Sequence, residues 1–217
     1  MLQQLSAGHD DPPDAVLFYR EFHTIVGSVI TLAKPLSIKS LAGLLRISEE
    51  DICDCIQPLS SVLQIPTDIE TPLRTLHLSF AEFLFSHKAQ DQPFGVDKPA
   101  THRMLLTNCL ALLSGPDGLR ENICNLKYPG QQRCEIDQVI IENRLSPEIQ
   151  YACRYWVHHA QNWNSPVRDD DAVHLFLQKH FRHWLEALSL MDAVTEAIMM
   201  LEMLENFVSV RVLQEDL

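Results

Sequence analysis

The chain has 217 residues, of which 46% are hydrophobic and 21% charged, a composition typical of a folded globular protein rather than a disordered one. Its formal net charge is −12, shared evenly between residues 1–100 and 101–217, which disfavours nucleic acid and anionic membranes as partners. The N-terminus lacks the pattern of a secretion signal, and the apolar stretch 25–33 is too short to span a bilayer. We therefore expect a cytoplasmic protein whose six cysteines are reduced.

The first half of the chain predicts a polar tail followed by three helices. Residues 1–13 are polar and contain Gly8 and a Pro-Pro pair, so we expect them to form a flexible tail. A helical apolar pattern then runs from Asp14 until Pro35 ends it. Ser37 and Ser48 are each placed to cap a further helix, the third one spanning 48–60 with Asp51 at the reciprocal capping position.

Two short β-like runs follow, Val62–Ile65 and Leu73–Leu78, with a polar turn between them. Three helices followed by a hairpin is the order of a winged-helix domain, which we assign to residues 14–89. DNA-binding winged helices need basic residues on the third helix. Here the third helix carries four carboxylates and no basic residue, so the DNA-binding interpretation fails on electrostatic grounds.

The segment Leu73–Leu84 places a histidine at the joint between the second β-like run and a helix. Alternation along a strand would turn Leu76 and Leu78 to one face and His77 to the other. Ser79 and Glu82 have the spacing of a capping box, and Phe80, Phe83 and Leu84 could bury together. His77 is then either a sensor of phosphate or charge, or a packed side chain, and the residues alone favour the packed side chain.

Residues 90–100 contain prolines and Gly95 and predict a linker, followed by an α-helical domain over 101–217, either a bundle or an array. Ser146 and Pro147 open one helix in the expected way, and Asp169–Asp171 suit the start of another. The fold class expected for the whole chain is mainly α. The expected helices of this domain span 102–113, 146–161, 169–188 and 190–207.

Catalytic motifs are absent from the sequence, and we predict that the chain is not an enzyme. It contains no phosphate-binding loop, no G-x-G-x-x-G and no G-x-S-x-G. We predict no metal site: Cys53 and Cys55 point apart on a helix, and the two histidine pairs have a simpler explanation as packed or surface residues. The tryptophans are expected to fill grooves between helices, and the methionines to form core or a partner-facing surface. The residues concerned are His158, His159, His180, His183, Trp156, Trp163, Trp184, Met191, Met199, Met200 and Met203.

Four strings give the chain a family resemblance: YREFHTIVGSVITLAKPLSIKSLAGLL, TPLRTLHLSFAEFL, SPEIQYACRYWVHHAQ and VHLFLQKHFRHWLEALSLM. From about Asp14 to Glu205 the chain resembles fungal STAND proteins, the NOD-like signalling ATPases that contain a NACHT domain and often WD or ankyrin repeats. The part it resembles lies directly after the NACHT domain, where the family has a winged helix and a helical region.

The resemblance implies a role for His77. In STAND ATPases the end of the winged helix carries a Met-His-Asp-type motif, whose histidine contacts the β-phosphate of ADP in the resting state. Leu76-His77-Leu78 falls on that motif by position. The resemblance therefore makes His77 a candidate ADP phosphate sensor, while Leu78 in place of the acid removes whatever the carboxylate contributes.

The expected function is a non-catalytic regulatory module that acts as a conformational switch or adaptor. Its partner is a NACHT domain, in cis or in trans, or another protein. No cofactor is expected in this chain itself, because the phosphate loop is not among its 217 residues and ADP or ATP would be reached only through a NACHT domain. The alternative is an independent helical protein–protein scaffold with no nucleotide role, motivated by the Met- and Trp-bearing helices near the C-terminus.

Overall fold

The protein was analysed as a computed structural model that describes residues 12–128, 130–163 and 170–215. The chain divides into two compact units, Met1–His102 and Arg103–Leu217, and the division falls inside the helix α7 (Lys98–Leu113). The expectation of a mainly α fold is confirmed. Among the described residues, each helix is too short or too polar to cross a membrane. Residues 1–11 of the expected tail, and Asp169, lie outside the described residues.

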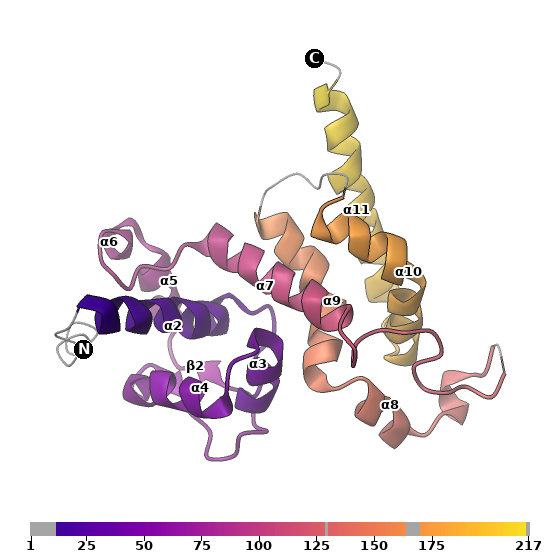
Figure 1. The fold of residues 1–217 in the computed structure, drawn as a ribbon, viewed down its shortest axis with the longest axis horizontal. Helices are drawn as coiled ribbons and strands as arrows, with labels where there is room; N and C mark the ends of the chain where they lie inside the picture. Colours follow the sequence, from indigo (N-terminus) through magenta and orange to yellow (C-terminus); the bar gives the residue numbers. More distant parts are fainter. Residues whose placement is uncertain (1–11, 129, 164–169, 216–217) are drawn as a thin grey trace. The chain divides into compact units, whose positions relative to one another are not determined.

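The first unit contains three helices followed by a two-stranded antiparallel sheet (Figure 1). The apolar stripes of the helices form its core, where Ile25, Leu44 and Ile56 are fully buried. The elements are α2 (Pro12–Thr31), α3 (Ile38–Leu45), α4 (Glu49–Ile56), η2 (Gln57–Leu59), β1 (Leu63–Gln64), β2 (Arg74–Thr75), α5 (Leu78–Phe85) and α6 (His87–Gln90).

Two of the expected helix caps in this unit are confirmed. The Ser37 hydroxyl accepts a hydrogen bond from the Ser40 N–H at 3.2 Å, and the Ser48 hydroxyl accepts one from the Asp51 N–H at 3.0 Å. Each satisfies a donor that the first turn of the helix leaves free. The hairpin is shorter than expected, because only Leu63↔Thr75 and Gln64↔Arg74 pair across it.

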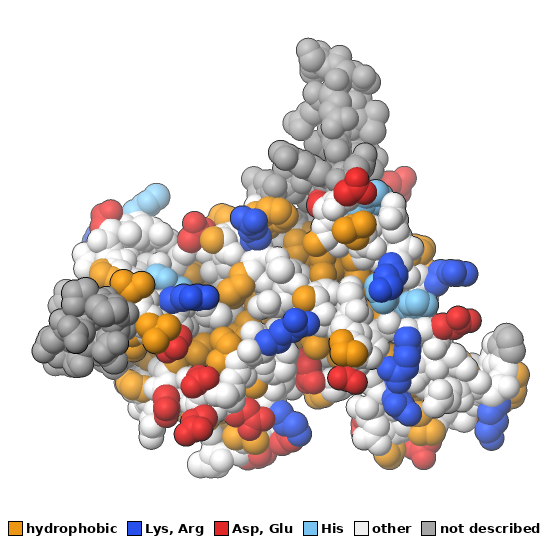
Figure 2. All heavy atoms as spheres, viewed as in Figure 1, with side chains coloured by type: hydrophobic (Ala, Val, Ile, Leu, Met, Phe, Trp, Pro, Cys, Tyr) orange, Lys and Arg blue, Asp and Glu red, His pale blue; other side chains and the backbone are white. Residues whose placement is uncertain are grey.

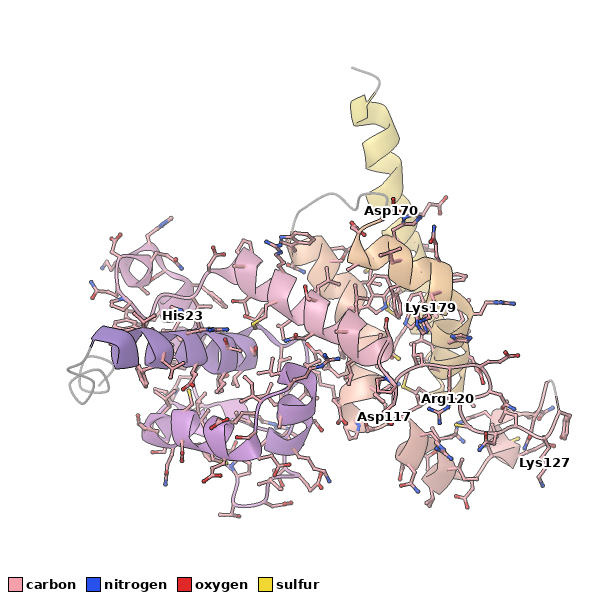
Figure 3. All side chains as sticks on the ribbon, in the orientation of Figure 1. His23, Asp117, Arg120, Lys127, Asp170 and Lys179 are labelled. Carbon is pink, nitrogen blue, oxygen red and sulfur yellow. The ribbon has the colours of Figure 1, made fainter. Side chains whose placement is uncertain are left out.

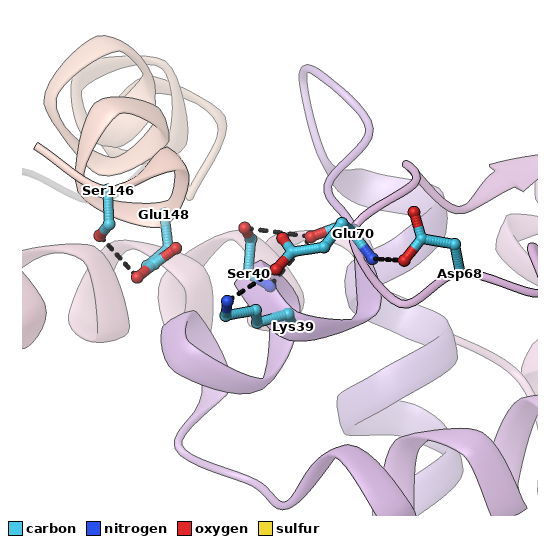
Figure 4. A network of polar contacts seen from close by, with 7 residues as sticks. Lys39, Ser40, Asp68, Glu70, Ser146 and Glu148 are labelled. Carbon is cyan, nitrogen blue, oxygen red and sulfur yellow. Dashed lines mark hydrogen bonds and ion pairs between the residues drawn. The ribbon is translucent and has the colours of Figure 1, made fainter. Parts of the chain in front are cut away.

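The turn between the strands is tied to α3 by one ion pair (Figure 4). The Lys39 Nζ lies 2.7 Å from the Glu70 Oε1, and the Lys39 N–H donates to the Ile69 carbonyl at 3.2 Å. The Glu70 N–H in turn donates to the Asp68 carboxylate at 3.0 Å. Both charged side chains of the pair are more than half exposed, so it orients the turn and adds little stability, about 0–1 kcal/mol.

The second unit is built from helices and irregular loops. The short helix α8 (Gln138–Arg144) was not anticipated by the sequence patterns, although Asp137 caps it by accepting from the Val139 N–H at 2.9 Å. Asp171 caps α10 (Ala172–Leu190), close to the helix start that the three aspartates indicated, with bonds of 2.9 Å from the Val173 and His174 N–H groups. The remaining elements are η3 (Arg133–Glu135), α8 (Gln138–Arg144), α9 (Pro147–Trp163), α10 (Ala172–Leu190) and α11 (Val194–Glu215).

Two tryptophans form the centre of this second unit. Trp156 on α9 and Trp184 on α10 are fully buried, and their rings meet edge to face with centroids 5.3 Å apart. The Trp184 indole N–H donates to the Cys153 carbonyl at 2.9 Å. Trp156 Nε1 is buried with no hydrogen-bond partner among the described residues. The two rings are equally buried, but only Trp184 forms a hydrogen bond through its indole N–H. Their position between α9 and α10 confirms that these tryptophans fill a groove between helices.

Replacing each of these tryptophans by phenylalanine will separate packing from hydrogen bonding. Trp184→Phe removes the hydrogen bond to the Cys153 carbonyl, so we expect it to lower the free energy of unfolding by about 0.5–1.5 kcal/mol more than Trp156→Phe does. Denaturant unfolding followed by circular dichroism measures the difference. Equal losses in the two variants would contradict a contribution from the Trp184 bond.

The cysteines predict a graded thiol reactivity. Burial raises the pKa of Cys153 to about 12 and also raises that of Cys109, whereas Cys134 is exposed. Because the thiolate is the reactive form, we expect Cys134 to react at once with a thiol reagent at pH 8, and Cys109 and Cys153 only after unfolding. Mass spectrometry of the labelled peptides identifies the sites. Labelling of Cys109 in the folded chain at the rate of Cys134 would be the contrary result.

Candidate functional site

His77 lies in the first unit at the point where the hairpin becomes α5. The Leu76 N–H donates to the Val62 carbonyl at 2.9 Å, which ends the pairing of the two β segments. His77 then adopts an extended conformation, with φ −135° and ψ 129°, and α5 begins at the next residue. The backbone on both sides of His77 is thus held by hydrogen bonds, since the Phe80 N–H donates to the His77 carbonyl at 3.1 Å.

The His77 side chain is exposed. Within the described residues its imidazole accepts no hydrogen bond from the first turn of α5. His77 is therefore not part of the buried core, and its role as a phosphate sensor stays a prediction. The side chain is exposed on a backbone held by hydrogen bonds, so a ring N–H can donate to an anion presented from outside the unit.

The expected helix cap at Ser79 is wrong by two residues. α5 begins at Leu78, so Ser79 lies inside the first turn and His77 occupies the capping position. The Ser79–Glu82 capping box therefore does not form at this end of the helix. The cause is tertiary: the hairpin fixes the backbone up to Leu76, and the first helical hydrogen bond then closes on the His77 carbonyl. The local sequence favoured a start that the hairpin does not permit.

The two chain neighbours of His77 are apolar and exposed, and α5 carries a further exposed aromatic ring. Leu78 is 73% exposed, and Leu76 and Phe83 are also exposed, whereas Phe80 and Leu84 are buried as expected. The expectation that Phe83 is buried with them is wrong; its ring packs at the surface, 6.2 Å from that of Phe94. Strict alternation of Leu76 and Leu78 on one face also fails, because Leu78 already belongs to the helix. His77 thus stands between two exposed leucines at the start of α5.

The face formed by α4 is acidic. Glu50, Asp51 and Asp54 are exposed while Ile52 and Ile56 point into the core. Figure 2 shows acidic side chains gathered over this helix in the first unit. This is the helix that a DNA-binding winged helix would present to the major groove, and its charge repels phosphate. The observation supports the sequence-based argument against DNA as a partner.

The other histidines singled out by the sequence have structural contacts in the second unit. His159 is fully buried, and its Nε2 lies 2.9 Å from the Tyr151 hydroxyl. His180 is buried and stacked on Phe176, with its Nδ1 3.4 Å from that of His183. His159 and His180 are thus packed side chains, whereas His158 is exposed. The prediction that the chain carries no metal site stays a prediction.

The comparisons with known proteins give one relative. The vegetative incompatibility protein HET-E-1 of Podospora anserina is 26% identical over 235 aligned residues. The alignment covers 95% of this chain but 16% of that protein, so the chain spans about one-sixth of the relative's length. No family model matches the chain, and no solved structure matches it. The assignment of residues 14–89 to the winged-helix class therefore stays a prediction, although the expected order of elements is present.

Buried histidines make the stability of the chain depend on pH. Burial lowers the pKa of His180, the neighbouring charges of Lys179 and His183 lower it further, and the Leu119 carbonyl opposes the shift. Burial also lowers the pKa of His23 on α2, labelled in Figure 3. A histidine whose folded pKa is depressed stabilises the protein fully above its unfolded pKa of 6.5, and this stability is lost as the pH falls below that value.

We therefore expect the free energy of unfolding to decrease as the pH falls from 7.5 to 5. The variant His180→Gln should flatten this decrease, because the unfolded state then takes up one proton fewer. Urea unfolding at a series of pH values measures the slope. His87→Gln, at an exposed position, is the control that should leave the slope unchanged. A slope identical in wild type and His180→Gln would contradict the assignment.

Proposed function

We propose that this chain is a non-catalytic regulatory module that acts as a conformational switch or adaptor next to a nucleotide-binding NACHT domain. The single observation that carries the proposal is the exposed His77 imidazole on a backbone fixed by the hairpin and α5. This geometry suits a group that reads an anion held by another domain, because the side chain can reach outward while its main chain stays in place.

The surroundings of His77 support a docking role. Its chain neighbours Leu76 and Leu78 are exposed, and adjacent large exposed apolar side chains favour burial against a partner. A NACHT domain that covers this surface would desolvate the imidazole and strengthen its hydrogen bond to the β-phosphate of ADP. Leu78 stands where the family motif has an acid, so His77 would act without a neighbouring carboxylate.

The similarity to HET-E-1 supports the same proposal at a coarser level. A regulatory role in the kind of process that the relative's name describes, vegetative incompatibility, is consistent with a chain that resembles the region after a NACHT domain. Catalysis by this chain is not part of the proposal. The partner would supply the phosphate-binding loop and the magnesium site, and this chain would supply contacts that differ between the closed and open states.

The test is nucleotide retention by a NACHT domain joined to this chain. We expect the joined protein to release ADP more slowly than the NACHT domain alone, and His77→Ala to raise the release rate by about tenfold, which corresponds to the loss of one charge-assisted hydrogen bond of about 1.4 kcal/mol. Release of a fluorescent ADP analogue followed by stopped flow measures the rate. His87→Ala, another exposed histidine of the first unit, is the matched control.

The outcomes separate the two functional hypotheses. An ADP release rate that does not change when the chain is joined to the NACHT domain would contradict the switch hypothesis. A protein partner that binds this chain equally well with His77→Ala and in the absence of any nucleotide would instead support the independent helical scaffold. That alternative is favoured by one feature of the second unit, the exposed apolar side chains of α11.

A further inference from the structure

A groove of about 340 Å³ lies between α7 and α10 in the second unit. The lining residues recur every three or four positions on each helix, so each set forms one face. The lining is largely apolar, with Phe176 buried at the base and Leu175 half exposed. The groove residues are Thr107, Leu110 and Ala111 on α7, Ser114 directly after it, and Ala172, Leu175, Phe176, Lys179 and His180 on α10.

The groove carries one positive charge. Lys179 is exposed and forms no ion pair with any described residue; Figure 3 shows it on α10. His180 beside it is mainly neutral at pH 7, because burial lowers its pKa. The nearest carboxylate in sequence before the groove, Asp171, is engaged in capping α10. The groove therefore suits an apolar surface that carries negative charge.

The outer face of α11 has the complementary composition. Val194, Ile198, Met199 and Met203 are 40–54% exposed. Glu202 and Glu205 on the same helix are also exposed and form no ion pair within the described part of the chain. Methionine-bearing helix faces adapt readily to grooves. Apolar side chains with unpaired carboxylates match an apolar groove with an unpaired lysine.

The lengths of the groove and of the exposed face of α11 also match, and the orientation of α11 excludes binding to the groove of the same copy. The groove follows α10 from 172 to 180 and the exposed face of α11 runs from 194 to 203, lengths of about 12 and 14 Å at 1.5 Å per residue. The opposite face of α11, with Ala197, Met200 and Leu204, is buried against α9 and α10 of the same unit. The outer face therefore points away from the helices of its own unit and is accessible to another molecule.

We propose that the α7–α10 groove of one copy of this chain binds the outer face of α11 from a second copy. The contact is head to tail, because the two surfaces are different and lie on one unit. Lys179 then pairs with Glu202 or Glu205 of the neighbouring copy while the methionines enter the groove. Each bound copy leaves one groove and one helix face free, so association continues beyond the dimer and weakens with added salt. No nucleotide-binding domain takes part.

The experiment is sedimentation velocity on the full chain over a concentration series, at 50 and 500 mM salt. We expect the mass of the wild type to rise with concentration past that of a dimer at low salt. Lys179→Glu, and separately the pair Glu202→Lys with Glu205→Lys, should each reduce self-association at least tenfold. Arg182→Glu is the matched control: it reverses an exposed charge on α10 outside the groove and should leave the association unchanged.

Mixing the two impaired variants tests the head-to-tail geometry. In the mixture each variant repels copies of itself, whereas both pairings between the two variants join opposite charges: the wild-type groove with the wild-type helix face, and the reversed groove with the reversed helix face. We therefore expect the mixture to regain the association that each variant alone has lost, with the two variants alternating. Lys179→Glu combined in one chain with both glutamate reversals should associate again. A wild type that stays monomeric, charge reversals without effect, or a mixture with no dimer would each overturn the proposal.

Folding of the variants is checked independently. All substituted side chains are exposed, so circular dichroism and the thermal midpoint should match those of the wild type. The salt dependence of the wild type supplies a second reading that needs no substitution. Association that grows stronger from 50 to 500 mM salt would contradict a contact between opposite charges.

Discussion

The edge-to-face contact of Trp156 with Trp184 is the interaction on which the second unit depends. It joins α9 to α10 at full burial, and the indole N–H of Trp184 fixes the rotation of α10 against α9 through the Cys153 carbonyl. Once that rotation is set, the position of Phe176 follows, because its ring packs against Trp156 at 5.4 Å. The same rotation turns Leu175 and Lys179 outward. A buried aromatic contact thus determines which residues of α10 reach the surface.

The first unit relies on a different constraint, the closure of a very short hairpin. Two residue pairs are too few to hold two strands by themselves, and the neighbouring backbone bonds make up for this. The Leu73 N–H donates to the Leu36 carbonyl at 2.8 Å, and Ser37 forms a bridge with Pro72. The hairpin is therefore anchored to the residues just before α3. This anchoring gives His77 a fixed main-chain position although its side chain is exposed.

The features that the sequence predicted well are those determined within a few residues. The caps at Ser37 and Ser48 need only a side-chain oxygen and the next turn of helix, and both were predicted. The start of α5 depends on a bond between Leu76 and Val62, fourteen positions apart, and was misplaced. The exposure of His77 depends on the same distant contacts. The sequence could therefore single out His77 as a candidate residue, but it could not show whether the side chain is exposed. The groove between α7 and α10 joins helices far apart in the sequence, and no local pattern indicates it.

The turn after α7 has a consequence for recognising related chains. A Cβ atom on Gly118 would lie 2.4 Å from the Leu113 carbonyl oxygen, and the Leu119 N–H donates to that same oxygen at 2.7 Å. The chain thus folds back on the end of α7 so closely that only glycine fits there. Any homologue that keeps this path must keep glycine at the aligned position. A homologue with another residue at this position must adopt a different turn, and the surface next to the last turn of its α7 helix would then have a different shape.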